Sequence, residues 1–327
     1  MATVRYDVTY TNGVIASREK YLLKDKLYRL CELSAEEAFR ALLESGFGGG
    51  AETTSDLYEY EKLVAVEEAR LDSFIREYAP SIAEATYLLA PRDFHNAKAF
   101  VKALYLGESV EKMLAPAGLL DILTLEKCIK DKDFSGIEKG NERLVDACNE
   151  AFALLEEDAS GAKVGAIFDK ALYAFLSETV KGKRVLKKLL SAKADMTNIL
   201  TAFRAQDIED AKEKYLPAGT LSETALETLF AGEEVAVGAF KRTAYAEFVN
   251  VCLQARAKGL PLTQAEKLRD GYDIAQFAQR KYELNKTEPF LYYVYRRKAE
   301  ISNVRITFVC LLAGLNEQEI KRRLRTV

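Results

Sequence analysis

A short polar motif recurs three times at nearly equal spacing along the chain. Each copy is an acidic residue followed three positions later by asparagine, and each leads into an apolar, helix-forming run. The asparagines lie 102 and then 105 residues apart. Constant spacing of this kind indicates an internal repeat, here of three related units of about 100 residues each. The copies are Asp93–Asn96, Asp195–Asn198 and Glu300–Asn303.

A second landmark follows the first two copies. The sequence Pro-Ala-Gly begins at Pro116, 23 residues after Asp93, and again at Pro217, 22 residues after Asp195. Two landmarks that keep their separation are a stronger sign of repetition than the tetrapeptide alone. The predicted units are residues 1–112, 113–214 and 215–327.

Helix signals occur almost throughout the chain. Ser34 and Glu37 have the spacing of a capping box, in which each side chain satisfies a backbone N–H of the other residue. Apolar residues keep helical spacing over 54–79 and 165–193, so the chain is predicted to be all-α. The same capping spacing occurs at Thr220–Glu223, at Thr263–Glu266 and, more loosely, at Asn316–Glu319.

Two short segments carry other signals. Alternation in VRYDVTY predicts a short strand or an extended arm within 3–16. Glycines end predicted helices at Gly107, at Gly314 and in the run Gly46–Gly50. Because that run follows a helix, it fits a flexible helix end better than a phosphate cradle.

The repeated motif has two interpretations. Residues three apart lie on the same helix face, so each acid and its asparagine point the same way. They could offer three equivalent contacts to a partner, or they could tie each helix to a neighbour within its own unit. Repetition in every unit favours the second interpretation. A buried amide left unpaired costs about 1–3 kcal/mol, so such amides should have partners.

Sequence signatures of catalysis and of cofactors are missing. There is no P-loop and no dinucleotide-binding glycine motif, so no cofactor is predicted. A single histidine makes a zinc site untenable, so no metal site is predicted. His95 and Asp93 could form a catalytic dyad of an all-α enzyme, but the other copies have threonine and serine at that position. No catalytic residue is therefore predicted. Carboxylate pairs such as Glu67-Glu68 indicate solvated helix faces.

Cysteine use and the missing signal core predict a cytoplasmic protein. The five cysteines are far apart and form no C-x-x-C pair, so they are predicted to be buried small hydrophobes. No apolar run is long enough to span a bilayer, and the N-terminus lacks the core of a signal peptide. A net charge of −3 gives no general positive field for nucleic acid.

Charge is uneven along the chain. From Leu291 onward eight basic residues face three acidic ones, a net +5, and the rest of the chain carries −8. Such a layout suits different neighbours at the two ends, or it places cations at helix C-termini, where the helix dipole favours them. The candidate partner contacts are Arg296, Arg297, Lys298, Arg322, Arg323 and Arg325.

The closing segment points to a family. Ala299–Arg325, AEISNVRITFVCLLAGLNEQEIKRRLR, resembles the closing signature of the C subunit of bacterial and archaeal V-type ATPases, the relative of the d subunit of the eukaryotic vacuolar ATPase. Asp93-Phe-His-Asn-Ala-Lys98 is similar to the Asp-x-x-Asn-x-Lys motif of that family's first unit. Length and repeat match across nearly the entire chain, although Leu200 replaces the corresponding cation in the middle copy.

The resemblance implies a non-catalytic rotor part. Members are helical funnels with approximate threefold symmetry that cap the cytoplasmic face of the membrane proteolipid ring and receive the axle formed by the D and F subunits. This chain would then be peripheral to the membrane through protein contacts. The alternative is a helical scaffold unrelated to rotary machines. Stacked helix-pair scaffolds repeat every ~34–47 residues, which the spacing found here disfavours.

Overall fold

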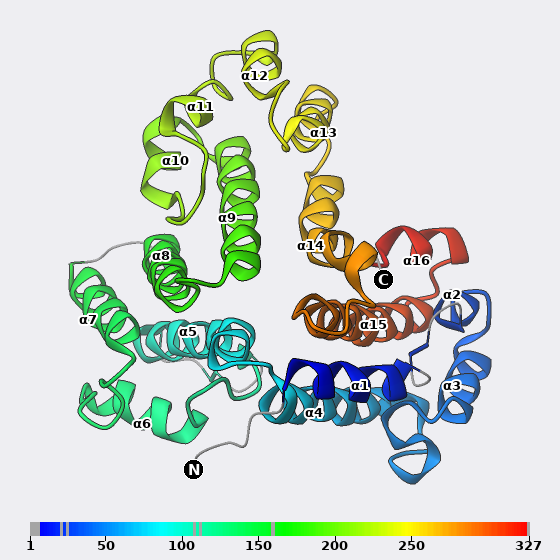
Figure 1. The fold of residues 1–327 in the computed structure, drawn as a ribbon. Coiled ribbons are helices and arrows are strands. Elements are labelled where there is room, and N and C mark those ends of the chain that lie inside the picture. Colours follow the sequence, from blue (N-terminus) through cyan, green and yellow to red (C-terminus); the bar gives the residue numbers. More distant parts are fainter. Residues whose placement is uncertain are drawn as a thin grey trace. The chain divides into compact units, whose positions relative to one another are not determined.

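The computed structural model describes residues 7–19, 22–23, 26–106, 109–110, 113–157 and 161–325. Over these ranges the chain forms sixteen α-helices and short 3₁₀ segments, and no strand (Figure 1). The all-α prediction is confirmed. The chain divides into two compact units, a first unit of residues 1–82 with 266–327 and a second unit of residues 83–265. The three-unit division stays a prediction.

Helix α15, Glu288–Leu312, is the centre of the first unit. It packs against α1, α2, α3, α4 and α16. Phe290 and Phe308 of α15 are fully buried and stack on Phe74 and Tyr60, with ring centroids 5.8 and 5.3 Å apart. The other helices are α1 (Val8–Arg18), α2 (Lys26–Leu30), α3 (Ala35–Glu44), α4 (Tyr60–Tyr78) and α16 (Glu317–Arg323), and α14 (Thr263–Phe277) crosses the unit boundary.

The second unit contains nine helices among the described residues. The helices α5 to α8 share one apolar core, in which Phe94, Phe168 and Cys148 are buried. The next helix, α9, contacts α8, α10, α11 and α13. The nine helices are α5 (Ile82–Leu106), α6 (Ile122–Asp131), α7 (Glu142–Glu156), α8 (Gly161–Thr179), α9 (Arg184–Arg204), α10 (Ile208–Lys214), α11 (Glu223–Glu227), α12 (Glu233–Phe240) and α13 (Ala246–Ala257).

Most helix ends follow the local signals. Both Ser34 with Glu37 and Asn316 with Glu319 form complete capping boxes. Helix α14 begins at Thr263, and Gly314 follows the end of α15 with a φ of 73°. Gly107 lies outside the described residues.

Two local predictions are wrong. Residues 8–18 form helix α1 and no strand, because the Asp7 carboxylate accepts the Thr9 N–H and starts a helix; residues 3–6 lie outside the described part. Ser222, and not Thr220, caps α11. The stretch 165–193 is helical as predicted, and a turn in which Gly182 adopts a φ of 77° divides it between two helices.

The cysteine prediction agrees with the structure. All five cysteines are buried and free, and burial raises the pKa of Cys148 and of Cys252 to about 12. No helix of the described chain has both the length and the apolar character needed to cross a membrane. Within the same ranges, no group of three or more His, Cys, Asp or Glu side chains is arranged to hold a metal ion.

Candidate functional site

Each asparagine of the repeated motif forms two hydrogen bonds with the backbone of one residue further along the chain. The Asn96 amide nitrogen donates to the Ala115 carbonyl oxygen at 3.1 Å, and its oxygen accepts the Ala115 N–H at 2.8 Å. Asn198 holds Leu216 in the same way, at 3.0 and 2.7 Å. Asn303 holds Arg325 at 2.9 and 2.7 Å. We call these three pairs the asparagine clamps.

The acids of the first two copies bind the chain a few residues further on. Asp93 accepts the N–H groups of Leu119 and Leu120, at 2.7 and 3.2 Å. Asp195 accepts those of Thr220 and Leu221 at 2.8 and 3.0 Å. It also accepts the hydroxyl groups of Thr220 and Tyr245 at 2.6 and 2.8 Å. Glu300 differs, since it accepts a hydrogen bond from Arg297 of its own helix.

The Pro-Ala-Gly landmark is the segment that these acids bind. A Cβ atom on Gly118 would lie 2.3 Å from the Asp93 Oδ1 atom, and one on Gly219 would lie 2.5 Å from the Asp195 Oδ1 atom. Real Cβ atoms do not approach other atoms so closely, so glycine is required where the backbone meets the carboxylate. The spacing of the two sequence landmarks therefore has a physical cause. It is the contact between them.

The clamp amides are buried, which leads to a prediction. Replacing Asn96, Asn198 or Asn303 by alanine removes the partner of one backbone N–H and one carbonyl, which are buried at Leu216 and partly buried at Ala115 and Arg325. We expect each substitution to lower the free energy of unfolding by about 1–3 kcal/mol, measured by urea denaturation. Unchanged unfolding with selective loss of partner binding would show that the asparagines are contact residues instead.

Asp93 and His95, which were considered as a catalytic dyad, each contact a backbone group of the following chain segment. The His95 Nε2 atom lies 2.8 Å from the Met113 carbonyl oxygen, and the Asp93 carboxylate is occupied by the loop that contains Gly118. Met113 and Ala115 belong to the same chain segment. His95 therefore acts beside Asn96, on the segment that the first clamp holds.

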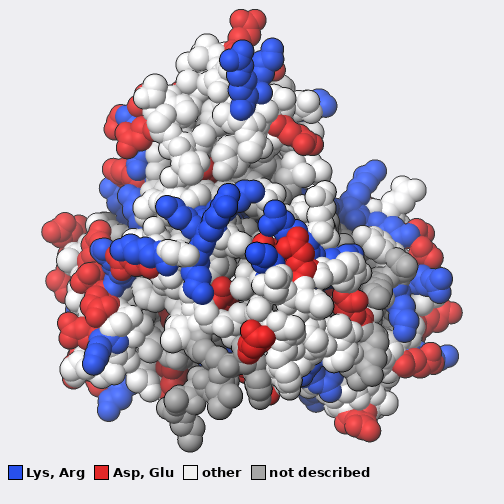
Figure 2. All heavy atoms as spheres, in the orientation of Figure 1, with Lys and Arg blue, Asp and Glu red and all other residues white. Residues whose placement is uncertain are grey.

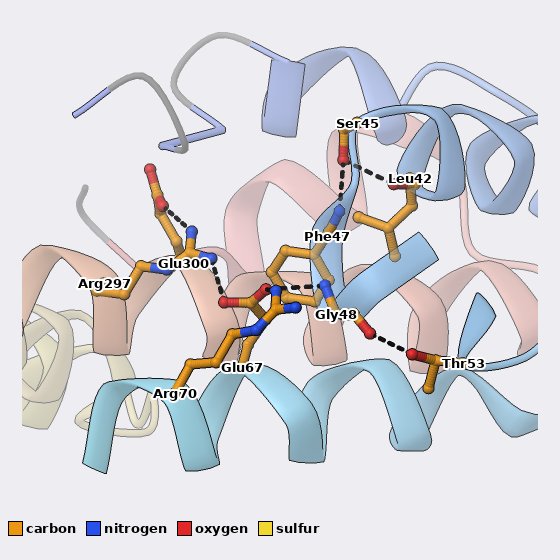
Figure 3. A network of polar contacts seen from close by, with 9 residues as sticks. All are labelled: Leu42, Ser45, Phe47, Gly48, Thr53, Glu67, Arg70, Arg297 and Glu300. Atoms are coloured by element: carbon orange, nitrogen blue, oxygen red, sulfur yellow. Dashed lines mark hydrogen bonds and ion pairs between the residues drawn. The ribbon is translucent and has the colours of Figure 1, made fainter. Parts of the chain in front are cut away.

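A buried ion-pair network lies in the first unit (Figure 3). Arg297 of α15 is 6% exposed and donates to Glu67 of α4 at 2.5 Å and to Glu300 at 2.9 Å. The other Glu67 oxygen accepts the Gly48 N–H and a nitrogen of Arg70, both at 2.8 Å. Two carboxylates and two guanidinium groups thus compensate each other at the α4–α15 contact.

The electrostatics of Glu67 follow from these contacts. Burial by itself would raise the pKa of the Glu67 carboxyl, because it disfavours the charged form. The Arg297 guanidinium opposes burial most strongly, followed by the Gly48 N–H and Arg70, and together they hold the pKa below its usual value. Glu67 is therefore ionised at neutral pH.

The glycine run is a tightly packed loop. Residues Phe47–Glu52 form a 3₁₀ segment in which Gly48 adopts a φ of 62°. A Cβ atom on Gly48 would lie 2.5 Å from the Leu63 Cα atom of α4. The run does end a helix, as expected, but its middle is buried against α4 and gives a backbone N–H to Glu67.

Reading Glu67 as a solvated residue was wrong, although the sequence holds a signal for it. Glu67 lies in register with the buried residues of α4, which recur every three or four positions from Tyr60 to Ile75. An acid inside an apolar stripe predicts a buried partner, here Arg297. Glu68, the next residue along α4, is the more exposed member of the pair.

The basic C-terminal residues do not form one surface. Arg297 is buried and is removed from the candidate contacts, whereas Arg322, Arg323 and Arg325 are exposed. Arg296 and Lys298 are half-buried. Arg305 pairs with Glu61 and Glu68 of α4, and Lys321 pairs with Glu32. Part of the positive charge of this segment is thus compensated within the first unit. Figure 2 shows basic and acidic side chains interspersed over the face that it draws.

The comparisons with known proteins identify the family. A model of the ATP synthase (C/AC39) subunit family matches residues 11–323. The chain belongs to this family. The C subunit of the V-type sodium ATPase of Enterococcus hirae is 21% identical over 332 aligned residues, which cover 97% of each chain. Membership of the C/AC39 family confirms the resemblance drawn from the closing segment and the repeat.

Proposed function

We propose that this protein is the non-catalytic rotor connector of a V-type ATPase or ATP synthase. It couples the axle of the D and F subunits to the membrane proteolipid ring, so that torque passes between the soluble head and ion movement. It acts at the cytoplasmic face of the membrane and is held there by protein contacts. The observation that carries this proposal is the family match over residues 11–323.

The repeated clamps support a funnel with approximate threefold symmetry. Three helices, α5, α9 and α15, each use an asparagine to hold a segment 18 to 22 residues further on. The same local construction, repeated about every 100 residues, is what three pseudo-equivalent units would require. Three such units around an axis could grip an axle.

Local chemistry agrees with a non-catalytic role. Asp93 and His95, the pair singled out as a dyad, hold backbone groups of the loop after α5. The exposed arginines near the C-terminus offer polar contacts of the kind that suits reversible assembly. We propose Arg322, Arg323 and Arg325 as contacts to a partner.

The test is a binding assay with the full chain. Purified protein is immobilised and exposed to the D–F axle and, separately, to the detergent-solubilised proteolipid ring. We expect binding to both, weakened by added salt because polar contacts are screened. Binding to neither, with each partner shown to be intact, would contradict the rotor role.

A pair of triple variants tests the contact residues. Arg322, Arg323 and Arg325 are replaced together by glutamine, which removes three exposed charges. The matched variant replaces Lys127, Lys130 and Lys139, which are exposed elsewhere and carry the same total charge. We expect only the arginine variant to weaken binding to one of the two partners. Equal effects would show that the arginines act through net charge alone.

A further inference from the structure

A cavity of about 640 Å³ lies in the first unit beside the buried ion-pair network. Its volume is in the range of small-molecule sites, which is about 300–1,000 Å³. Its walls come from α1, the glycine loop, α4 and α15, and Figure 3 shows five of its residues, Ser45, Phe47, Glu67, Arg70 and Arg297. The rotor role makes no use of this cavity.

The walls combine an apolar surface with a few converging polar groups. Leu71 and Phe74 of α4, with Leu23 and Phe47, provide the apolar part. Arg18, Arg70, Arg297 and Tyr293 provide most of the polar part. This composition is typical of sites that bind an organic molecule by its body and orient it by its head group.

Charge in the walls is unbalanced by one cation. Arg297 and Arg70 are compensated by Glu67 and by Glu300 behind the wall. Arg18, in contrast, has its guanidinium carbon 5.0 and 5.4 Å from the ring centroids of Phe74 and Tyr78. Across the described chain it forms no ion pair with a carboxylate. A half-buried guanidinium without a carboxylate favours an anionic ligand.

A second observation points to the same ligand. Tyr293 is 7% exposed, and no described residue forms a hydrogen bond with its hydroxyl group. Burial raises the pKa of this hydroxyl, so it remains a donor. The hydroxyl oxygen is not among the buried polar atoms that lack a partner, so it can be reached from the cavity that Tyr293 lines. A donor in the wall of a cavity is available to a ligand that carries an acceptor.

We propose that this cavity binds a small organic carboxylate. The carboxylate group is held by Arg18 and by the Tyr293 hydroxyl, and the apolar body lies against Leu71 and Phe74. Each part of the ligand meets a matching part of the wall: a negative charge for the unbalanced cation, an acceptor for the free donor, and hydrocarbon for the apolar side chains.

The test uses the full chain and a fluorescent reporter. The apolar anion 8-anilinonaphthalene-1-sulfonate is titrated into the protein and then displaced by hexanoate or by hexan-1-ol. We expect saturable binding at one site and displacement by hexanoate, but not by the same concentration of the alcohol. Absence of saturable binding, or equal displacement by the two competitors, would overturn the proposal.

Variants locate the site. Arg18→Gln and Tyr293→Phe should each weaken hexanoate binding about tenfold, the loss of one strong hydrogen bond. Arg18→Lys should lose less affinity for hexanoate, and Arg40→Gln, at an exposed position outside the cavity, should leave it unchanged. Tyr293→Phe removes a single oxygen and keeps the ring packing, and circular dichroism checks the fold of every variant. Unchanged hexanoate affinity in both Arg18→Gln and Tyr293→Phe would refute the assignment.

Discussion

Replacing Arg297 by methionine is expected to lower the free energy of unfolding by about 3–5 kcal/mol at pH 7. The substitution keeps most of the side-chain volume and removes the charge that compensates Glu67 and Glu300. Both carboxylates are at least nine-tenths buried, so water compensates only part of the lost interaction. Urea denaturation followed by circular dichroism measures the change.

The effect of Arg297→Met should depend on pH. In the native protein the pKa of Glu67 is lowered, so its stabilising contribution is present above the unfolded pKa of about 4.5 and is lost as the pH falls through the folded pKa. In the variant, burial is no longer opposed by Arg297, so Glu67 destabilises the fold while it is ionised. The difference between the two proteins should be largest at neutral pH and should shrink below about pH 4.5.

A matched arginine on the same helix is the control. Arg305 also bridges α15 to α4, but its side chain is 40% exposed, and the side chains of its partners Glu61 and Glu68 are also partly exposed. Arg305→Met should therefore change stability by about 1 kcal/mol or less. Adding Glu67→Gln to Arg297→Met should recover part of the loss, because it removes one buried carboxylate that has lost its buried cationic partner. Equal losses in the two arginine variants would contradict the importance of burial.

Replacing Asp195 by alanine is expected to lower the free energy of unfolding by about 3–5 kcal/mol, the second large effect. Asp195 is fully buried and accepts two N–H groups from Thr220 and Leu221 and two hydroxyl groups from Thr220 and Tyr245. Each donor left without an acceptor costs about 1–3 kcal/mol, and local relaxation recovers part of the sum. Thermal and urea unfolding both report the change.

Asp146 provides the comparison for Asp195. It lies on an exposed position of α7 in the second unit, and Asp146→Ala should alter the free energy of unfolding by no more than about 0.5 kcal/mol. An effect of Asp195→Ala as small as this would show that water replaces the carboxylate, and that the loop after Gly219 does not depend on it.

Local sequence signals were sufficient to predict the helices and the repeat. Capping boxes at Ser34 and Asn316, apolar periodicity and helix-ending glycines act within a few residues, so they can be read along the chain. The repeat spacing is preserved because a clamp joins residues fewer than thirty positions apart, as Asn96 joins Ala115. A fold class and a family follow from such short-range information.

Charge balance was decided by the tertiary structure. The sequence places a surplus of cations after Leu291, but Arg297 and Arg305 are compensated by acids of α4 that lie more than 200 positions earlier. Local patterning treated Glu67 as a solvated acid, and only the packing of α4 on α15 makes it a buried partner. The sequence by itself determined helices, repeat and family, because neighbours along the chain set them. The ion-pair network and the cavity beside Arg18 depend on distances between residues in the folded protein. Counting charges along the sequence gives no information on those distances.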